Sequence, residues 1–160
     1  NDMWDTMYEA QGVGLAAPQI GQSIRLFIVD TYPFSDNEGL SINERKFLKS
    51  FKMVFINPEI IEENGKECFF NEGCLSIPGI REDVKRKESI IIKFQDLNGK
   101  FKKKSFSGIA ARVIQHEYDH IEGILFTDKL SPLKRKIIKR KLDEISIGKI
   151  EVDYNMKFIK

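Results

Sequence analysis

The feature that most constrains this chain is its only pair of histidines, placed four residues apart in the stretch 116–120, which reads His-Glu-Tyr-Asp-His. On an α-helix, residues at this spacing share a face, with Cβ atoms about 5–6 Å apart. His116 and His120 can therefore bind one metal ion, with Glu117 placed to take a proton from water held by that ion. The sequence predicts a helix over 109–121 whose inward, metal-binding face also carries apolar residues: Ile109, Val113 and, nearby, Ile124.

A catalytic metal site needs a third protein ligand and an open position for water. The chain has no further histidine, so this ligand must be of another type. Cys74 is the preferred candidate, because it lies in a glycine-bearing turn that follows a strand-like segment. A thiolate with two imidazoles suits Zn²⁺ or Fe²⁺. Glu144, in the next predicted helix, remains a formal alternative, and Cys68 is expected to be a small buried apolar side chain.

Length and charge narrow the class of protein. The 160 residues, 41% of them hydrophobic, predict one domain over 1–160 with a substantial core. With 26 Lys+Arg and 24 Asp+Glu, the near balance of charge argues against a DNA partner. No apolar run reaches about 18 residues, so no membrane association is expected. Two cysteines predict a reducing compartment, and a start at Asn1, inside a helix, predicts a preceding N-terminal segment.

The hydrophobic pattern predicts an α+β fold: small, mostly antiparallel or mixed sheets packed around the central helix, plus a C-terminal helix. The clearest element is a hairpin of strands 89–95 and 100–106 around Asn98-Gly99. Ser107 is expected to cap the central helix, and Ser131 a last helix over 132–147. The remaining expectations are a helix over 2–10, a packed loop over 15–21, strands over 24–30, 53–61 (an edge strand interrupted at Asn57-Pro58) and 66–70, a surface loop over 31–52, and an extended arm or short strand over 149–160.

Three blocks of the sequence resemble the signature motifs of the peptide deformylase family. They are Gly-Val-Gly-Leu-Ala-Ala-Pro-Gln at 12–19, Glu-Gly-Cys-Leu-Ser at 72–76 and Gln-His-Glu-Tyr-Asp-His at 115–120. They occur in the family's order, and the resemblance spans nearly the whole chain. It implies removal of formate from the N-terminal formyl-methionine of nascent polypeptides. It also implies Fe²⁺ as the usual cation, with Zn²⁺, Ni²⁺ or Co²⁺ in its place, and a bacterial cytoplasmic location, with an organelle left open.

The resemblance also implies roles for single residues. Cys74, His116 and His120 would hold the metal, and Glu117 would be the general base and then the general acid. Gln19 and the backbone N–H of Leu75 would bind the developing oxyanion.

Eight further positions follow from the motifs less directly. Glu72 is expected beside the ligands, with Arg81 pairing to it or to a substrate carbonyl. Arg112 stands where many relatives carry an apolar residue, and we expect it at the mouth of the pocket. Val13 and Gly14 are expected to contact the extended substrate and to form part of the methionine pocket. Phe70, Ile109 and Val113 are expected to line that pocket, with core packing as the alternative.

Two other functions stay open on the residues alone. One is a zinc peptidase with Cys74 as third ligand, and the other is a structural metal site or a ribosome-bound module. The last helix bears on the ribosome-bound module, because it carries many basic residues. An apolar stripe at Leu133, Ile137, Leu142 and Ile145 is expected to pack this helix on the domain. The basic residues of the helix form either a solvated face or a surface that docks on ribosomal RNA: Lys134, Arg135, Lys136, Lys139, Arg140 and Lys141.

Overall fold

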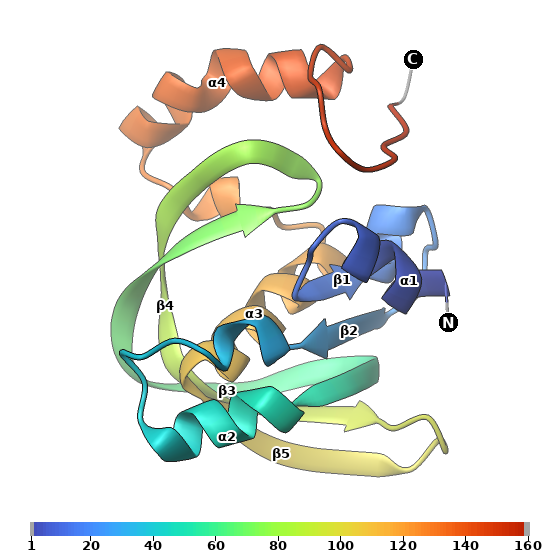
Figure 1. Cartoon of the computed structure of the whole chain (residues 1–160), viewed down its shortest axis with the longest axis vertical. Coiled ribbons are helices and arrows are strands. Elements are labelled where there is room, and N and C mark those ends of the chain that lie inside the picture. Colours follow the sequence, from blue (N-terminus) through green and yellow to red (C-terminus); the bar gives the residue numbers. More distant parts are fainter. Residues whose placement is uncertain (1, 159–160) are drawn as a thin grey trace.

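The computed structural model describes residues 2–158 and contains a five-stranded antiparallel sheet in the order β1-β2-β3-β4-β5, with helix α3 packed against it (Figure 1). The α+β prediction is confirmed. In chain order the helices and strands are α1 (Asp2–Glu9), β1 (Gly14–Ala16), β2 (Leu26–Asp30), α2 (Ile42–Ser50), β3 (Lys52–Cys74), β4 (Ile77–Gln95), β5 (Phe101–Ser107), α3 (Gly108–Ile121) and α4 (Pro132–Ser146). Short 3-10 turns cover Ala17–Ile20, Tyr32–Phe34 and Phe126–Lys129.

A long hairpin of β3 and β4 dominates the molecule and curves from the sheet up to α4 (Figure 1). At its base, β4 contributes Ile90 and Ile92 to a hydrophobic cluster that joins the sheet to α3. Nearer its tip, the same strand contributes Ile80 and Val84 to a second cluster, which also contains Phe126 and packs against α4. The tight turn between the two strands carries Cys74 at its start, so the hairpin places this residue beside the second cluster.

The strand expected over 53–61 is longer and more central than predicted. It is part of β3, which pairs with β2 on one side and β4 on the other, so the edge position was wrong. Asn57 adopts a positive φ of 48°, and the β3–β4 register shifts between Ile56 and Glu59. Proline cannot donate a ladder hydrogen bond, and this bulge accommodates Pro58 inside a central strand.

Two segments expected to be loops contain regular structure. The stretch 31–52 includes α2, whose Ser41 hydroxyl accepts from the backbone N–H of Glu44 while the Glu44 carboxylate accepts from the backbone of Ser41. The stretch 15–21 is not an irregular loop, because its first residues complete β1 and a 3-10 turn follows. Short β1 pairs with β2, so this motif is anchored at one edge of the sheet.

The predicted central helix and the predicted last helix are both present. Ser107 precedes α3, although its side chain makes no capping bond, and the Ser131 hydroxyl accepts from the backbone N–H of Lys134 at the start of α4. The predicted stripe on α4 is wrong in part: Leu133 and Ile137 are exposed, and the residues that pack on the second cluster are Ile138, Leu142 and Ile145.

After α4, residues 151–158 form no regular helix or strand, and the arm crosses back toward the rest of the molecule (Figure 1). Residues 159 and 160 of the predicted arm lie outside the described residues. None of the helices within 2–158 combines the length and apolarity needed to cross a membrane.

Candidate active site

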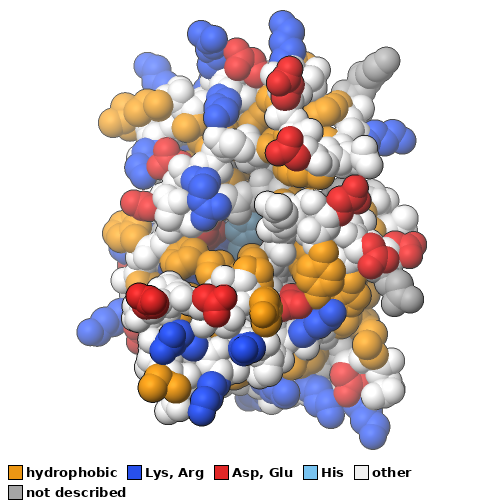
Figure 2. Space-filling model, in the orientation of Figure 1, with side chains coloured by type: hydrophobic (Ala, Val, Ile, Leu, Met, Phe, Trp, Pro, Cys, Tyr) orange, Lys and Arg blue, Asp and Glu red, His pale blue; other side chains and the backbone are white. Residues whose placement is uncertain are grey.

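A pocket of about 440 Å³ opens between β1, the turn of the long hairpin and α3. Figure 2 shows a hollow near the middle of this face, with histidine visible at its floor. His116 and Glu117 reach the pocket from α3, while Cys74 and Leu75 reach it from the hairpin turn. These side chains meet because Ala111 and Ile114 of α3 pack into the first cluster, which directs another face of the helix toward the pocket.

Cys74, His116 and His120 are brought together in a way that suits a metal ion. One ligand atom from each lies within 4.8 Å of the others. The Cys74 Sγ is 3.2 Å from His120 Nε2, and the two imidazole centroids are 5.1 Å apart. This donor set of one sulfur and two nitrogens is typical of Zn²⁺ or Fe²⁺ sites and leaves room for a further ligand.

Glu72 fixes the ring of His116. Its Oε2 accepts from His116 Nδ1 at 2.9 Å, which leaves His116 Nε2 for a cation. Arg86 donates to both oxygens of the same carboxylate, at 2.7 and 2.9 Å, and its third nitrogen contacts Asp119. Lys129 also pairs with Asp119, so a chain of buried and half-buried charges runs beneath the ligands.

Burial and neighbouring charges give these side chains different pKa values. Burial raises the pKa of Glu117 to about 7. Burial lowers the pKa of His120 to about 3, with the charges of His116 and Arg86 acting in the same direction. For Glu72 and His116 burial is outweighed: hydrogen bonds from His116 and Arg86 lower the pKa of Glu72 to about 2, and bonds to Cys74 and Glu72 raise that of His116 to about 10.

Glu117 is buried beside the ligand cluster, and its Oε2 has no hydrogen-bond partner within residues 2–158. Gly14 of β1 faces this carboxylate so closely that a Cβ there would come within 2.7 Å of Glu117 Cδ. A buried acid with an unpartnered oxygen and a pKa near neutrality has the properties of a general base. The unpartnered oxygen also indicates that water or a substrate group belongs next to it.

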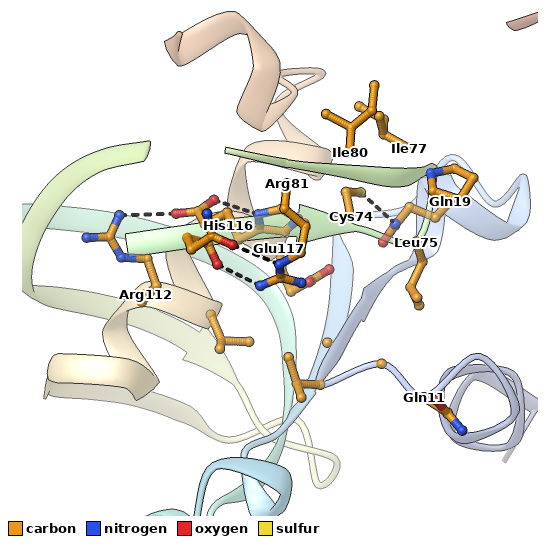
Figure 3. A pocket seen from close by; sticks show the side chains of 18 of the residues that line it. Gln11, Gln19, Cys74, Leu75, Ile77, Ile80, Arg81, Arg112, His116 and Glu117 are labelled. Carbon is orange, nitrogen blue, oxygen red and sulfur yellow. Dashed lines mark hydrogen bonds and ion pairs between the residues drawn. The ribbon is translucent and has the colours of Figure 1, made fainter. Parts of the chain in front are cut away.

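Gln19 is held with its amide N–H₂ toward the hairpin turn. Its Oε1 accepts from the backbone N–H of Ala16 at 2.8 Å, which orients the amide. Its Nε2 is 3.0 Å from Ser76 Oγ and 3.7 Å from Cys74 Sγ (Figure 3). A neutral hydrogen-bond donor therefore faces the cysteine from the 3-10 turn that follows β1.

Comparisons with known proteins agree with this geometry. The family model described as Polypeptide deformylase matches residues 1–136. The chain belongs to the polypeptide deformylase family. Members of this family are metal-dependent hydrolases that remove the formyl group from N-terminal formyl-methionine. This deformylase therefore acts on nascent formyl-peptides, as expected from its motifs.

Individual relatives support the same assignment. The chain is 60% identical over 158 residues to the peptide deformylase of Christiangramia forsetii, covering 99% of this chain and 81% of that relative. A crystal structure of a peptide deformylase from Legionella pneumophila is 44% identical, with a TM-score of 0.74 over 93% of this chain and 79% of that one. A peptide deformylase of Arabidopsis thaliana solved with an inhibitor is 34% identical, with a TM-score of 0.76 over 92% and 75%.

Arg112 of this deformylase lines the pocket, but not as an exposed side chain at its mouth. It is buried, with 4% of its surface accessible, and its Nη1 donates to Glu72 Oε1 at 3.1 Å (Figure 3). The side chain is buried and not exposed at the rim, because its guanidinium pairs with the carboxylate of Glu72 on β3. Arg81 makes no pair with Glu72, and it donates instead to the side chain and backbone of Asn71.

The deformylase pocket gathers most of the predicted substrate contacts. Val13, Gly14, Phe70 and Val113 line it, as do Leu75 and Arg81. Ile109 does not, because it borders a separate hollow formed with α2 and β5.

Several lining or supporting residues escaped the sequence analysis, and three of them bear most directly on the site. Tyr154, in the arm after α4, lines the deformylase pocket and donates to the backbone oxygen of Leu75 at 2.6 Å. Phe34 lines it from the 3-10 turn after β2, with its ring 6.2 Å from that of Phe70. Arg86 lies beneath the ligands. No signal in the sequence singles out Arg86, because it stands between two lysines in a charged run where burial of one residue is not expected.

Proposed function

We propose that Cys74, His116 and His120 are the metal ligands of this deformylase and hold one divalent cation. Fe²⁺ is the proposed physiological ion, with Zn²⁺, Ni²⁺ or Co²⁺ able to take its place. The observation that carries the proposal is the gathering of three ligand atoms within 4.8 Å, beside a buried and unpartnered oxygen of Glu117. Both histidines come from one rigid helix, which favours a preformed site.

Glu117 is the proposed general base and acid. When bound, the cation would polarise the formyl carbonyl and make water a better nucleophile at neutral pH. Glu117 takes a proton from the attacking water, whose oxygen bonds to the formyl carbon. As the bond between that carbon and the methionine nitrogen breaks, Glu117 returns the proton to the nitrogen. Formate and a free amino terminus are the products. The pKa of Glu117 near 7 suits both steps.

Gln19 and the backbone N–H of Leu75 are the proposed donors to the oxyanion. The Ala16 N–H orients the Gln19 amide so that its Nε2 faces Cys74. A fixed donor of this kind stabilises charge as it develops, and loss of one such donor typically costs about 10²–10³ in rate.

The methionine side chain is proposed to enter the apolar part of the pocket, between Phe70 and Val113. Val13 and Gly14 lie at the end of β1, where an extended peptide can lie along the edge of the sheet. Arg81 is proposed to reach a carbonyl of the peptide. Because the matched relatives include bacterial enzymes, we propose a bacterial cytoplasmic location.

Ribosome docking through the basic residues of α4 is a separate proposal. Among the basic residues of this helix, Lys134, Lys139 and Arg140 each pair with an acid of the same chain, and Lys141 contacts the backbone of Gly79. These pairs neutralise part of the basic surface. Salt-dependent co-sedimentation with ribosomes, with and without charge reversal at Arg135 and Lys136, tests this proposal.

The roles of the site residues are tested by formate release from formyl-Met-Ala-Ser by protein purified without oxygen and loaded with Fe²⁺ or Ni²⁺. Glu117→Gln should lower kcat/KM by at least about 100-fold, because a positioned base contributes roughly 10²–10⁴. It should still bind one metal ion per chain. The matched control is Glu122→Gln, which removes an acid from the end of the same helix and should keep the parent rate.

Activity of Glu117→Gln within fivefold of the parent would refute Glu117 as the base. Cys74→Ser, His116→Ala and His120→Ala should each lose tight metal binding. Cleavage of unformylated peptides with no formate release would instead favour the zinc peptidase alternative.

A further inference from the structure

We propose that Arg112 is a positioning residue of the metal site, which holds the Glu72 carboxylate so that His116 presents Nε2 to the cation. This inference rests on the proposed function, in which His116 is a ligand. Arg112 touches neither the ligand atoms nor Glu117 through any hydrogen bond among residues 2–158. Its effect on the site must therefore pass through Glu72.

Two side chains of helix α3 bind the Glu72 carboxylate, one at each oxygen. Arg112 and His116 lie four residues apart on α3, so their side chains share a face. Arg112 Nη1 donates to Glu72 Oε1 at 3.1 Å, and His116 Nδ1 bonds to Glu72 Oε2 at 2.9 Å. Each carboxylate oxygen is thus tied to the same helix, which fixes the plane of the carboxylate relative to the imidazole.

Arg86 holds the same carboxylate from β4, and among the described residues it reaches α3 only through its contact with Asp119. Apart from His116 itself, Arg112 is the α3 residue within 2–158 that donates directly to Glu72. The guanidinium is itself immobilised, because it also donates to the backbone oxygens of Val84 and Cys68 at 3.1 and 2.7 Å.

The burial of the Arg112–Glu72 ion pair argues against the explanation that Arg112 only stabilises the fold. The side chain of Arg112 is 5% exposed and that of Glu72 is 4% exposed. A buried ion pair is weak evidence for stability, because apolar residues of similar volume often stabilise a fold as well or better. Its fixed geometry, by contrast, serves a ligand that must point in one direction.

The test is the dissociation constant for Zn²⁺, measured by competition with a chromogenic chelator on the full chain. Arg112→Met keeps most of the side-chain length and removes the donors. We expect its dissociation constant to rise about 10- to 100-fold, the usual cost of removing a group that orients a metal ligand. The control is Leu48→Ala in α2, which should destabilise the first cluster with a dissociation constant within about twofold of the parent.

Three further measurements separate the explanations. Arg112→Lys, which keeps the charge and tests the site if the methionine variant does not fold, should recover part of the affinity. In a Glu72→Gln background, Arg112→Met should add less than threefold, because the path through Glu72 is already broken. The Co²⁺-loaded protein should show a changed visible absorption spectrum in Arg112→Met and an unchanged one in Leu48→Ala.

The proposal is overturned if Arg112→Met leaves the Zn²⁺ dissociation constant within twofold of the parent, whether or not its melting temperature falls as that of Leu48→Ala does. A different result would show that the assumption beneath the proposal, that His116 is a metal ligand, is wrong. If His116→Ala binds Zn²⁺ as tightly as the parent, then His116 is not a ligand, and the proposed function fails before Arg112 is considered.

Discussion

Gly14 shows how one residue without a side chain shapes the candidate site. It lies in β1 against the Glu117 carboxylate, and a Cβ at this position would overlap Glu117. Glu117 is itself buried, with 4% of its surface accessible, so it has little room to move away. The second glycine of the Gly-Val-Gly block is therefore explained by the space that the carboxylate occupies.

Gly14→Ala should displace Glu117 and lower kcat/KM for formate release by about 100-fold, since an error of about 1 Å in placement can cost that much. The free energy of unfolding should fall by about 1–3 kcal/mol from overpacking. Gly39→Ala, on the surface loop, is the control, because its Cβ would meet only the Asn37 side chain. If Gly14→Ala keeps half of the parent activity, Gly14 does not constrain the base.

At this scale, spacing predicted which residues gather but not how charged side chains orient. His116, Glu117 and His120 share one helix, so helical geometry alone brings them together. Arg112 lies on the same helix, but its buried position depends on Glu72, which is 40 residues away in the chain. A local pattern contains no information on such a partner, and an isolated arginine on a helix is usually exposed.

At the scale of elements, the predicted hairpin and the two C-terminal helices rest on local signals, and these were sufficient. Helix α2 was missed, although its Ser41-x-x-Glu44 capping box was present in the sequence, because charged residues and nearby Pro33 and Gly39 suggested a loop. Continuous β3 was missed for another reason. Pairing with both β2 and β4 stabilises its bulge at Asn57-Pro58, and such long-range pairing cannot be inferred from the segment itself.

The arm after α4 provides the prediction at this scale. Tyr154→Phe removes the hydrogen bond to the Leu75 backbone oxygen and keeps the ring in place. Such a bond contributes about 0.5–1.5 kcal/mol net. If it holds Leu75 for the oxyanion, kcat/KM for formyl-Met-Ala-Ser should fall by up to about tenfold. Tyr32→Phe is the control, because Tyr32 is an exposed residue outside the pocket. Equal rates for Tyr154→Phe and the parent would show that the arm does not position Leu75.

At the scale of the whole molecule, the candidate ligands join parts of the chain that are far apart in sequence. Cys74 comes from the turn of the long hairpin, and the histidines come from α3. A cation bound by all three would link the hairpin to the helix and would bind the folded chain better than the unfolded one. Metal content and global stability should therefore be coupled.

Removal of the metal with a chelator should lower the melting temperature by on the order of 5–15 °C, as expected when a ligand is present at about 100 to 1,000 times its dissociation constant. Added Zn²⁺ or Ni²⁺ should restore it. Differential scanning calorimetry of the parent and of Cys74→Ser measures the effect, and the variant should show almost no shift. The coupling would be contradicted if the parent protein lost all of its metal to the chelator and kept the same melting temperature.

The long hairpin also has a consequence for motion. Its two ends belong to different hydrophobic clusters, one with the sheet and α3 and the other with Phe126 and α4, and the pocket lies where they meet. Between them, the β3–β4 register shifts from Asn64 to Glu67, next to Gly65 with a φ of 83°. The ion pairs that Glu72 and Arg86 make with Arg112 and Asp119 of α3 span this shift, so they restrict tilting and hold the outer half of the hairpin, with Cys74, against the helix.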